Sequence, residues 1–287
     1  MEATDNKDFA GKYGFTWWMG IVEKINDPLK LGRCRVRCVG WHTDNKSLLP
    51  TDDLPWAMSS IPVNTNNVYP PREGDMVFGF FVDGENAQVP VILGVLPGIP
   101  LNAANYQQGF NDARTPEEVS AAPVKPYESS TNYPRKLDEP TTSRLARNDS
   151  DYPSEILTAK KEKKASKVEP DSYYNAKYPY NNVYESESGH ALEFDDTKGA
   201  ERVHVYHRSG SYTEWGPEGD RVERIQRNKF EVVIGDEKVY IKGNVELYVD
   251  GNVNMEVGGN FQAEIGGTCE INSSGNMSFN APQIDFN

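Results

Sequence analysis

Long hydrophobic runs are missing from this sequence of 287 residues. No apolar segment approaches the roughly 20 residues that a membrane-spanning helix requires. The first ten residues, MEATDNKDFA, contain neither the basic segment nor the apolar segment with which a secretory signal peptide begins. We therefore expect the chain to be made and assembled in a cytoplasm, without Sec-type export.

Positive charge is also scarce, because 30 lysines and arginines stand against 43 aspartates and glutamates, which gives a formal net charge of −13. Nucleic-acid affinity comes largely from lysine and arginine contacts to phosphate, so this balance disfavours it. Arg33, Arg35 and Arg37 form a local basic stretch, and because they alternate along a predicted strand they share one face. We interpret that face as solvent-exposed or protein-contacting, and we expect no nucleic-acid partner.

Cysteine is rare as well, with three in the chain, and an odd number cannot pair completely within one chain. Cys34 and Cys38 lie four residues apart on the same face of a predicted strand. That separation is too large for a disulfide unless the strand bends. We expect both residues to be buried, reduced thiols.

What the sequence has instead is a strict eight-residue repeat in its C-terminal third. A glycine opens each of six octads and is followed mostly by Asn or Asp, a combination that favours tight turns because these residues tolerate positive φ. After the turn, alternate positions are apolar at 16 of 18 sites, and the residues between them are mostly polar. The glycines that we assign to the repeat turns are Gly235, Gly243, Gly251, Gly259, Gly267 and Gly275.

Alternation within each octad predicts one short strand with one buried face, and a single strand cannot bury that face alone. Two arrangements remain open: a single-chain β-helix, or three identical chains wound together, each supplying one wall of a triangular prism. The short, strict octad favours the second arrangement, an intertwined triple-stranded β-helix in a homotrimer. The predicted trimer core consists of Val245, Leu247, Val249, Val253, Met255, Val257, Phe261, Ile265 and Ile271.

The N-terminal third has the pattern of short strands separated by turns. Segments such as RCRVRCVGWH and DMVFGFFVDG alternate or run apolar, and prolines or Asp-Gly pairs lie between them. Roughly five strands in so short a segment, without a convincing helix, indicate a small barrel such as an OB fold. The predicted fold class is therefore all-β.

Two groups of motifs resemble one family. The segment NDPLKLGRCRVRCVGWH, followed by LPWAMSSIP and GDMVFGFFVDGENAQVPVILGVLPG, is similar to the OB domain of the central baseplate spike of T-even-like contractile-tailed phages. The segment ESESGHALEFDDTKGAERVHVYHRSGSYTEWGPEGD resembles the neck of that spike and of the VgrG proteins of type VI secretion, and the octads resemble the needle. The predicted domains are an N-terminal arm (1–13), an OB-fold domain (14–105), an extended linker (106–183), a neck (184–234) and an octad-repeat β-helix needle (235–287).

The resemblance implies a structural spike of the virion's tail baseplate, which docks on the hub through its OB domain and pierces the host outer membrane mechanically. The T-even spike carries a lysozyme domain between barrel and needle. Here the interval 101–183 is short, rich in proline and charged, so we expect a linker and no enzyme. VgrG proteins fuse the hub to the spike, whereas this sequence starts close to the barrel, so we expect the hub to be a separate protein.

No catalytic or metal-binding constellation stands out, and we expect no catalytic residue, cofactor or metal site in this chain. His204 and His207 are three apart in a predicted strand and therefore point to opposite faces. Asp195 and Asp196 are neighbours on a strand and diverge, whereas a glycosidase needs two converging carboxyl groups. The alternative function, a β-helical tail-associated polysaccharide depolymerase, needs a wide carbohydrate groove that octads this short do not provide.

The octad pattern runs to Ala281 and then gives way to Pro282, which cannot donate a ladder hydrogen bond and therefore suits the end of a sheet. We expect Pro282, Ile284 and Phe286 to form a blunt apolar end that serves as a docking surface. The family resemblance implies a small, cone-shaped PAAR-like protein at this tip, carrying the metal that this chain lacks.

Overall fold

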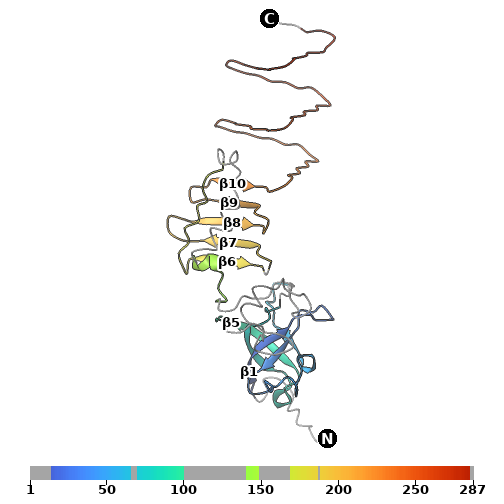
Figure 1. The fold of residues 1–287 in the computed structure, drawn as a ribbon, viewed down its shortest axis with the longest axis vertical. Helices are drawn as coiled ribbons and strands as arrows, with labels where there is room; N and C mark the ends of the chain where they lie inside the picture. Colours follow the sequence, from blue (N-terminus) through green and yellow to red (C-terminus); the bar gives the residue numbers. More distant parts are fainter. Residues whose placement is uncertain (1–13, 66–69, 100–139, 149–168, 187, 285–287) are drawn as a thin grey trace. The chain divides into compact units, whose positions relative to one another are not determined.

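The computed structural model describes residues 14–65, 70–99, 140–148, 169–186 and 188–284. They belong to two compact units, one ending at Phe230 and the other beginning at Glu231. The first unit contains a barrel and a five-stranded sheet, and the second contains the octads (Figure 1). In the described part of the chain, no helix has both the length and the apolar character needed to cross a membrane.

The barrel confirms the predicted OB-like, mostly β architecture. Its strands are β1 (Thr16–Lys24), β2 (Cys34–Cys38), β3 (Trp56–Ser59), β4 (Met76–Phe81) and β5 (Pro90–Leu96). They close in the order β1-β2-β3-β5-β4, so that every strand has two neighbours and the barrel has no free edge. β3 and β5 run parallel, and the other neighbouring strands run antiparallel.

Alternating side chains of the strands fill the barrel interior. In β1, Trp18 and Val22 are buried in the core, whereas Trp17 points outward and is exposed. Cys34 and Cys38 are buried free thiols, as predicted. Burial raises the pKa of each thiol to about 12, so neither is a reactive thiolate near neutral pH.

Close strand crossings in the barrel require glycine at two positions. A Cβ atom at Gly79 in β4 would lie 1.7 Å from the carbonyl oxygen of Val91 in β5. A Cβ atom at Gly20 in β1 would lie 2.6 Å from the carbonyl oxygen of Arg37 in β2. Neither distance is compatible with a side chain, so these glycines let the small barrel close.

The prediction that Arg33, Arg35 and Arg37 share one outer face is wrong for Arg37. A register irregularity near the end of β1 accompanies the burial of Glu23, and Arg37 Nε donates to Glu23 Oε1 at 2.7 Å. Both side chains are fully buried. Thr51 Oγ donates to the other carboxylate oxygen at 2.6 Å, so the buried pair is supported by a further hydrogen bond.

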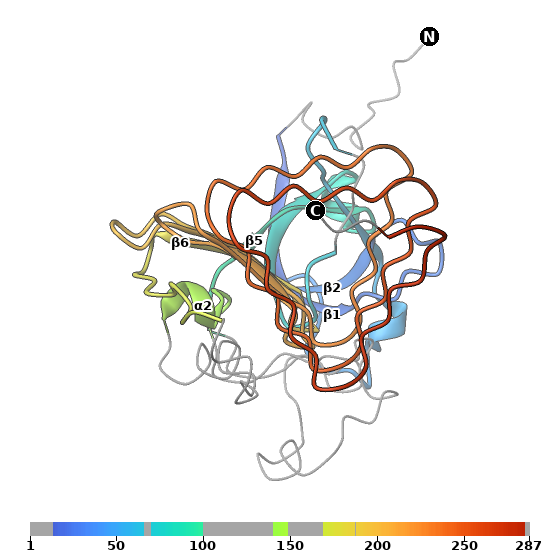
Figure 2. The ribbon, with the colours of Figure 1, turned by 90° about the horizontal axis from the view of Figure 1, so that it is seen from above.

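The second part of the first unit is an antiparallel sheet in which each strand pairs with the next one along the chain (Figure 1). Its strands are β6 (Asn181–Glu185), β7 (Ala191–Asp195), β8 (Arg202–Tyr206), β9 (Tyr212–Trp215) and β10 (Arg221–Arg224). The short helix α2 (Arg144–Arg147) lies beside β6 (Figure 2) and contributes Leu145 to a small core. α2 belongs to the interval predicted to be an extended linker, of which 106–139 and 149–168 lie outside the described residues.

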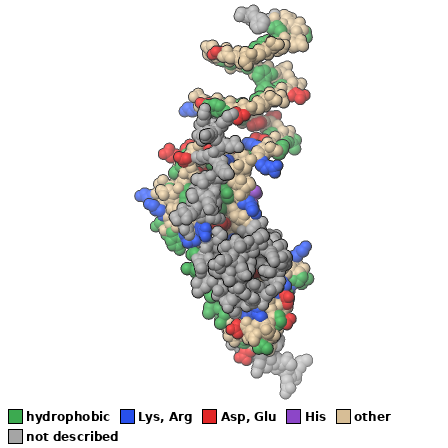
Figure 3. Space-filling view, in the orientation of Figure 1, with side chains coloured by type: hydrophobic (Ala, Val, Ile, Leu, Met, Phe, Trp, Pro, Cys, Tyr) green, Lys and Arg blue, Asp and Glu red, His purple; other side chains and the backbone are tan. Residues whose placement is uncertain are grey.

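The second unit bends at regular intervals. Its described residues, 231–284, contain no strand. The bends recur every eight residues, and each of the first six includes one of the predicted repeat glycines. Between bends the chain runs irregularly and winds into an open coil (Figures 1 and 2). In the space-filling view, open space separates successive turns of this coil (Figure 3).

Candidate functional site

The barrel carries an exposed aromatic surface on the outside of β1 and β4. The register places Trp17 opposite Phe80 and Met19 opposite Phe78, and Phe15 adds a fourth aromatic ring. The ring centroids of Phe15, Trp17 and Phe80 lie 4.9 to 6.1 Å apart. Trp17 is 56% exposed and Met19 is 55% exposed. We call these five residues the barrel patch; its contiguous apolar surface is typical of a protein-contacting site.

The loop that follows β1 presents two leucines on a fixed backbone. The Asp27 carboxylate accepts hydrogen bonds from the backbone N–H groups of Leu29, Leu31 and Arg33. It also pairs with the Arg33 guanidinium at 2.7 Å. The hydrogen bond from Arg33 outweighs the cost of burial and, with the backbone donors, holds the pKa of Asp27 well below its usual range. Leu29 and Leu31 remain exposed; they follow β1, which carries part of the barrel patch, by a few residues in the sequence.

The other arginines of the basic stretch are engaged within the barrel. The Arg35 guanidinium stacks on the Trp56 ring at 4.5 Å, and Arg33 lies over the same ring at 5.4 Å. Arg35 also donates to the carbonyl oxygen of Leu54 at 2.5 Å. These contacts direct both guanidinium groups to partners in the chain, which fits a structural role for the stretch.

Among the described residues, no segment covers the apolar face of the β6–β10 sheet. Cross-strand pairing places Tyr184, Leu192 and Val205 in one row, and Phe194 and Trp215 belong to the next row. Their exposed fractions range from 36% for Leu192 to 62% for Tyr184. We call these five residues the neck face. Antiparallel sheets commonly pack one face on a core, and contiguous exposed apolar surface is typical of an interaction site.

The opposite face of the same sheet buries charge. Arg202 donates to Glu193 Oε1 at 2.6 Å and to Glu214 Oε2 at 2.8 Å, and His204 Nδ1 lies 2.5 Å from Glu193 Oε2. All four side chains are almost completely buried. Burial opposes the ionisation of Glu193, but the hydrogen bond with His204 and the charge of Arg202 outweigh it and lower its pKa. We call these four residues the charged cluster.

Segments that are distant in sequence seal the charged cluster from water. Ser172 Oγ and the Tyr173 N–H donate to the two carboxylate oxygens of Glu214, at 2.8 and 3.1 Å. The Arg202 guanidinium lies over the Tyr174 ring at 4.8 Å. Tyr174 in turn donates to the carbonyl oxygen of Leu145 at 2.6 Å. Sequence analysis did not identify this cluster, because polar residues on alternate positions of a strand also fit a solvent-exposed face.

The octad residues predicted to form a trimer core are all exposed in the single chain. Their exposed fractions run from 46% at Val257 to 76% at Leu247. Monomeric soluble proteins rarely expose so much contiguous apolar surface. The exposed residues of the predicted trimer core are Val245, Leu247, Val249, Val253, Met255, Val257, Phe261, Ile265 and Ile271.

The residues predicted at the tip are described in part. Pro282 lies at the last bend of the octad region, and Ile284 is 44% exposed. Phe286 lies outside the described residues. The predicted docking role of these three residues therefore stays a prediction.

In each of the two residue pairs considered above for catalysis or metal binding, one side chain is buried and the other is exposed. Asp195 is buried and accepts a hydrogen bond from the Thr197 N–H at 2.9 Å, whereas Asp196 is exposed. His204 is buried in the charged cluster and His207 is exposed, so these two histidines point to opposite faces, as predicted. Across the residues that the structure describes, no three or more His, Cys, Asp or Glu side chains gather as a metal site.

The comparisons with known proteins all point to the same family. The family model for the Gp5 N-terminal OB domain matches residues 40–198, which is more than half of the chain. Protein Gp5 of Vibrio phage KVP40 is 39% identical over 287 residues, covering 82% of this chain and 63% of that protein. The pre-baseplate central spike protein Gp5 of Enterobacteria phage T4 is 36% identical over 108 residues, covering 33% of this chain and 19% of that protein. The chain thus spans less than two thirds of the length of either relative.

Proposed function

Because the chain belongs to the Gp5 N-terminal OB domain family, we propose that it is a structural spike at the centre of a contractile tail baseplate. In this role it docks on a baseplate hub, pierces the host cell envelope and has no catalytic activity of its own. The name of the T4 relative, a pre-baseplate central spike protein, supports the assignment. The observation that carries it is the octad region, whose apolar residues lie on a regularly bent chain without any cover in the single copy.

The missing cover for the octads is supplied by two further copies of the chain. Each octad offers one apolar edge, and only identical octads repeat with the same eight-residue spacing along their whole length. The open space between successive turns of the coil leaves room for strands from the other copies (Figure 3). Three chains wound together pair each backbone with its neighbours and turn the apolar residues toward a common axis. A closed prism of this kind has no lateral strand edge and resists bending.

The neck face joins the same assembly. Val205 is 48% exposed and Phe194 is 50% exposed on a face that no described segment covers. In the proposed homotrimer, three neck faces pack against one another and bury this apolar surface. The charged cluster and its covering segments then lie on the outer side of each sheet.

The barrel patch provides the surface for the hub, which we propose to be a separate protein. Trp17 and Phe80 contribute large, rigid apolar area of the kind that dominates stable interfaces. At the opposite end of the chain, Pro282, Ile284 and Phe286 form the proposed seat for a PAAR-like tip protein. Within the virion, the protein then belongs to the tail baseplate.

Light scattering on the purified full chain tests the proposal. A trimer has three times the chain mass of 32.2 kDa. Negative-stain images should show a globular end and a thin rod. A stable, soluble monomer contradicts the proposal, and degradation of capsule or peptidoglycan in a zymogram would favour the depolymerase alternative.

A further inference from the structure

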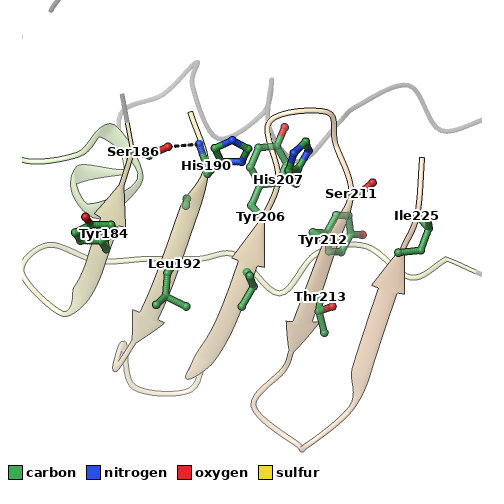
Figure 4. A pocket seen from close by; sticks show the side chains of 12 residues that line it. Tyr184, Ser186, His190, Leu192, Tyr206, His207, Ser211, Tyr212, Thr213 and Ile225 are labelled. Carbon is green, nitrogen blue, oxygen red and sulfur yellow. Dashed lines mark hydrogen bonds between the residues drawn. The ribbon is translucent and has the colours of Figure 1, made fainter. Parts of the chain in front are cut away.

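Two histidines face each other across the ends of β7 and β8. The β7–β8 register pairs Ala191 with Tyr206, and continuing the same register outward by one position sets His190 opposite His207. Their ring centroids are 4.4 Å apart, and the ring planes are inclined by 54°. Figure 4 shows both rings side by side at the rim of a hollow of about 450 Å³ on the apolar side of the sheet.

Both histidine backbones are fixed by reverse turns. The His190 N–H donates to Ser186 Oγ at 3.0 Å, and the His190 carbonyl accepts from the Ser186 N–H at 2.8 Å. The His207 N–H donates to the Ser211 carbonyl and the His207 carbonyl accepts from the Gly210 N–H, both at 2.8 Å. Because these groups bond to the turns, the two histidines form a non-hydrogen-bonded cross-strand pair, the type in which facing side chains approach most closely.

We propose that His190 and His207 together chelate one divalent transition metal ion of the Zn²⁺, Ni²⁺ or Cu²⁺ class through their Nε2 atoms. Imidazole is a favoured ligand of these ions. With metal–nitrogen bonds of about 2.0–2.1 Å, two imidazoles at right angles on one ion have ring centres roughly 4.5 Å apart. The observed ring spacing of 4.4 Å matches that arrangement.

Ligation through Nε2 places a proton on each Nδ1, and the contacts of the two Nδ1 atoms show what this gains and what it costs. His207 Nδ1 lies 2.8 Å from Ser209 Oγ, which can accept an Nδ1–H hydrogen bond and so fix the tautomer whose Nε2 carries the free electron pair. The Ser209 N–H donates to the same Nδ1 at 3.1 Å, a hydrogen bond that ligation through Nε2 would break. The Arg208 N–H approaches His190 Nδ1 at 3.4 Å, a long contact that costs little to lose.

In the single chain, the remaining coordination positions are open to water. His207 is exposed and His190 is half-buried there, so an ion can reach the pair from solution before three neck faces pack together. A two-histidine chelate completed by solvent binds an exchangeable ion, in contrast to a closed structural site with four protein ligands. Spacing in the sequence could not reveal the pair, because the two histidines meet only through the strand register.

Calorimetric titration of the full, tag-free chain with ZnCl₂ and with NiCl₂ near neutral pH tests the proposal. We expect saturable binding whose affinity falls by at least about tenfold in His190→Gln and in His207→Gln. Glutamine retains hydrogen-bonding capacity and removes the imidazole ligand. His42→Gln is the matched control, because His42 is a half-buried histidine in the barrel, and it should bind as the unmodified chain does.

Stoichiometry gives a second readout. One ion per chain means that the pairs act separately, and one ion per three chains means that pairs from three copies converge on a shared ion; either result supports the chelate. Absence of saturable binding overturns it. Equal affinity in the unmodified chain and in the His190→Gln/His207→Gln double variant also overturns it, provided that thermal melts without metal show the variant to be folded.

Discussion

The barrel and the octad region treat their apolar residues in opposite ways. In the barrel, Trp18, Val36 and Phe81 are at least 96% buried within one chain. In the octads, Leu247 and Met255 are more than 70% exposed. Both regions alternate apolar and polar residues as strands do. The difference lies in what covers the apolar face of each. The barrel closes its sheet on itself, and the octads need other chains to do so.

This contrast separates two kinds of stability. Closure of the barrel places its core contacts within about 80 residues of one chain, and we expect it to fold as an independent unit. Burial of the octads depends on association, so their stability depends on protomer concentration. The two regions should therefore respond differently to the same kind of substitution.

The largest effect is expected from a charge in the octad core. Val253→Asp places three like charges near the proposed axis, at a cost of several kcal/mol for each unpaired buried ion. Light scattering should then report the single-chain mass, while the barrel retains its near-ultraviolet circular dichroism. Asn254→Asp, one position along and on the polar side, is the control and should still form a trimer. A trimeric Val253→Asp variant contradicts the inward orientation of this residue.

Removal of one partner from the charged cluster should have the next largest effect. Glu193→Ala leaves the buried Arg202 and His204 without a shared carboxylate, which costs roughly 3–5 kcal/mol in the free energy of unfolding. Glu223→Ala removes the exposed partner of Arg221 and should cost about 0–1 kcal/mol. Urea unfolding of both variants measures the difference. Equal losses would show that the cluster is not effectively buried in solution.

The same variant defines a pH dependence. Because the folded-state pKa of Glu193 lies below its ordinary value of 4.5, the carboxylate stabilises the fold at pH values above 4.5. This contribution is lost as the pH falls through the folded-state pKa. The difference in stability between the unmodified chain and Glu193→Ala should therefore be constant near neutrality and shrink in acid.

Thiol labelling compares the two regions directly. Cys34 and Cys38 are fully buried in the barrel, whereas Cys269 occupies an inward position of the octad pattern and is exposed in the single chain. A thiol reagent should leave all three cysteines unmodified in the assembled protein. On dilution or in mild denaturant, Cys269 should react first, and mass spectrometry locates the label. Rapid labelling of Cys269 in a verified trimer would show that this position faces outward.

The smallest effect on stability is expected from the barrel patch. Trp17→Ser removes a largely exposed ring and should change the unfolding free energy by less than about 1 kcal/mol, because surface substitutions usually have small effects. It should nevertheless reduce co-purification with the hub protein. Trp18→Ser, at the buried neighbouring position, is the contrast and should destabilise the barrel strongly. Undiminished hub binding by Trp17→Ser would place the hub contact elsewhere, for example at Leu29 and Leu31.

The barrel and the regular bends of the octads could be predicted because each follows from a short sequence period. The burial of Glu23 with Arg37 could not, because it depends on a local register irregularity and not on alternation. The charged cluster was missed for another reason. Glu193 and Arg202 occupy the polar positions of their strands, and only the covering segments around Leu145 and Tyr174, distant in sequence, exclude water from them.

The eight-residue spacing of the bends makes the length of the octad region a stepwise quantity. Inserting or deleting one whole octad keeps every glycine at a corner and every apolar residue on its side. An insertion of one residue instead moves all later side chains to the opposite side. Insertions or deletions of eight codons can therefore change the length of this region without disturbing its pattern.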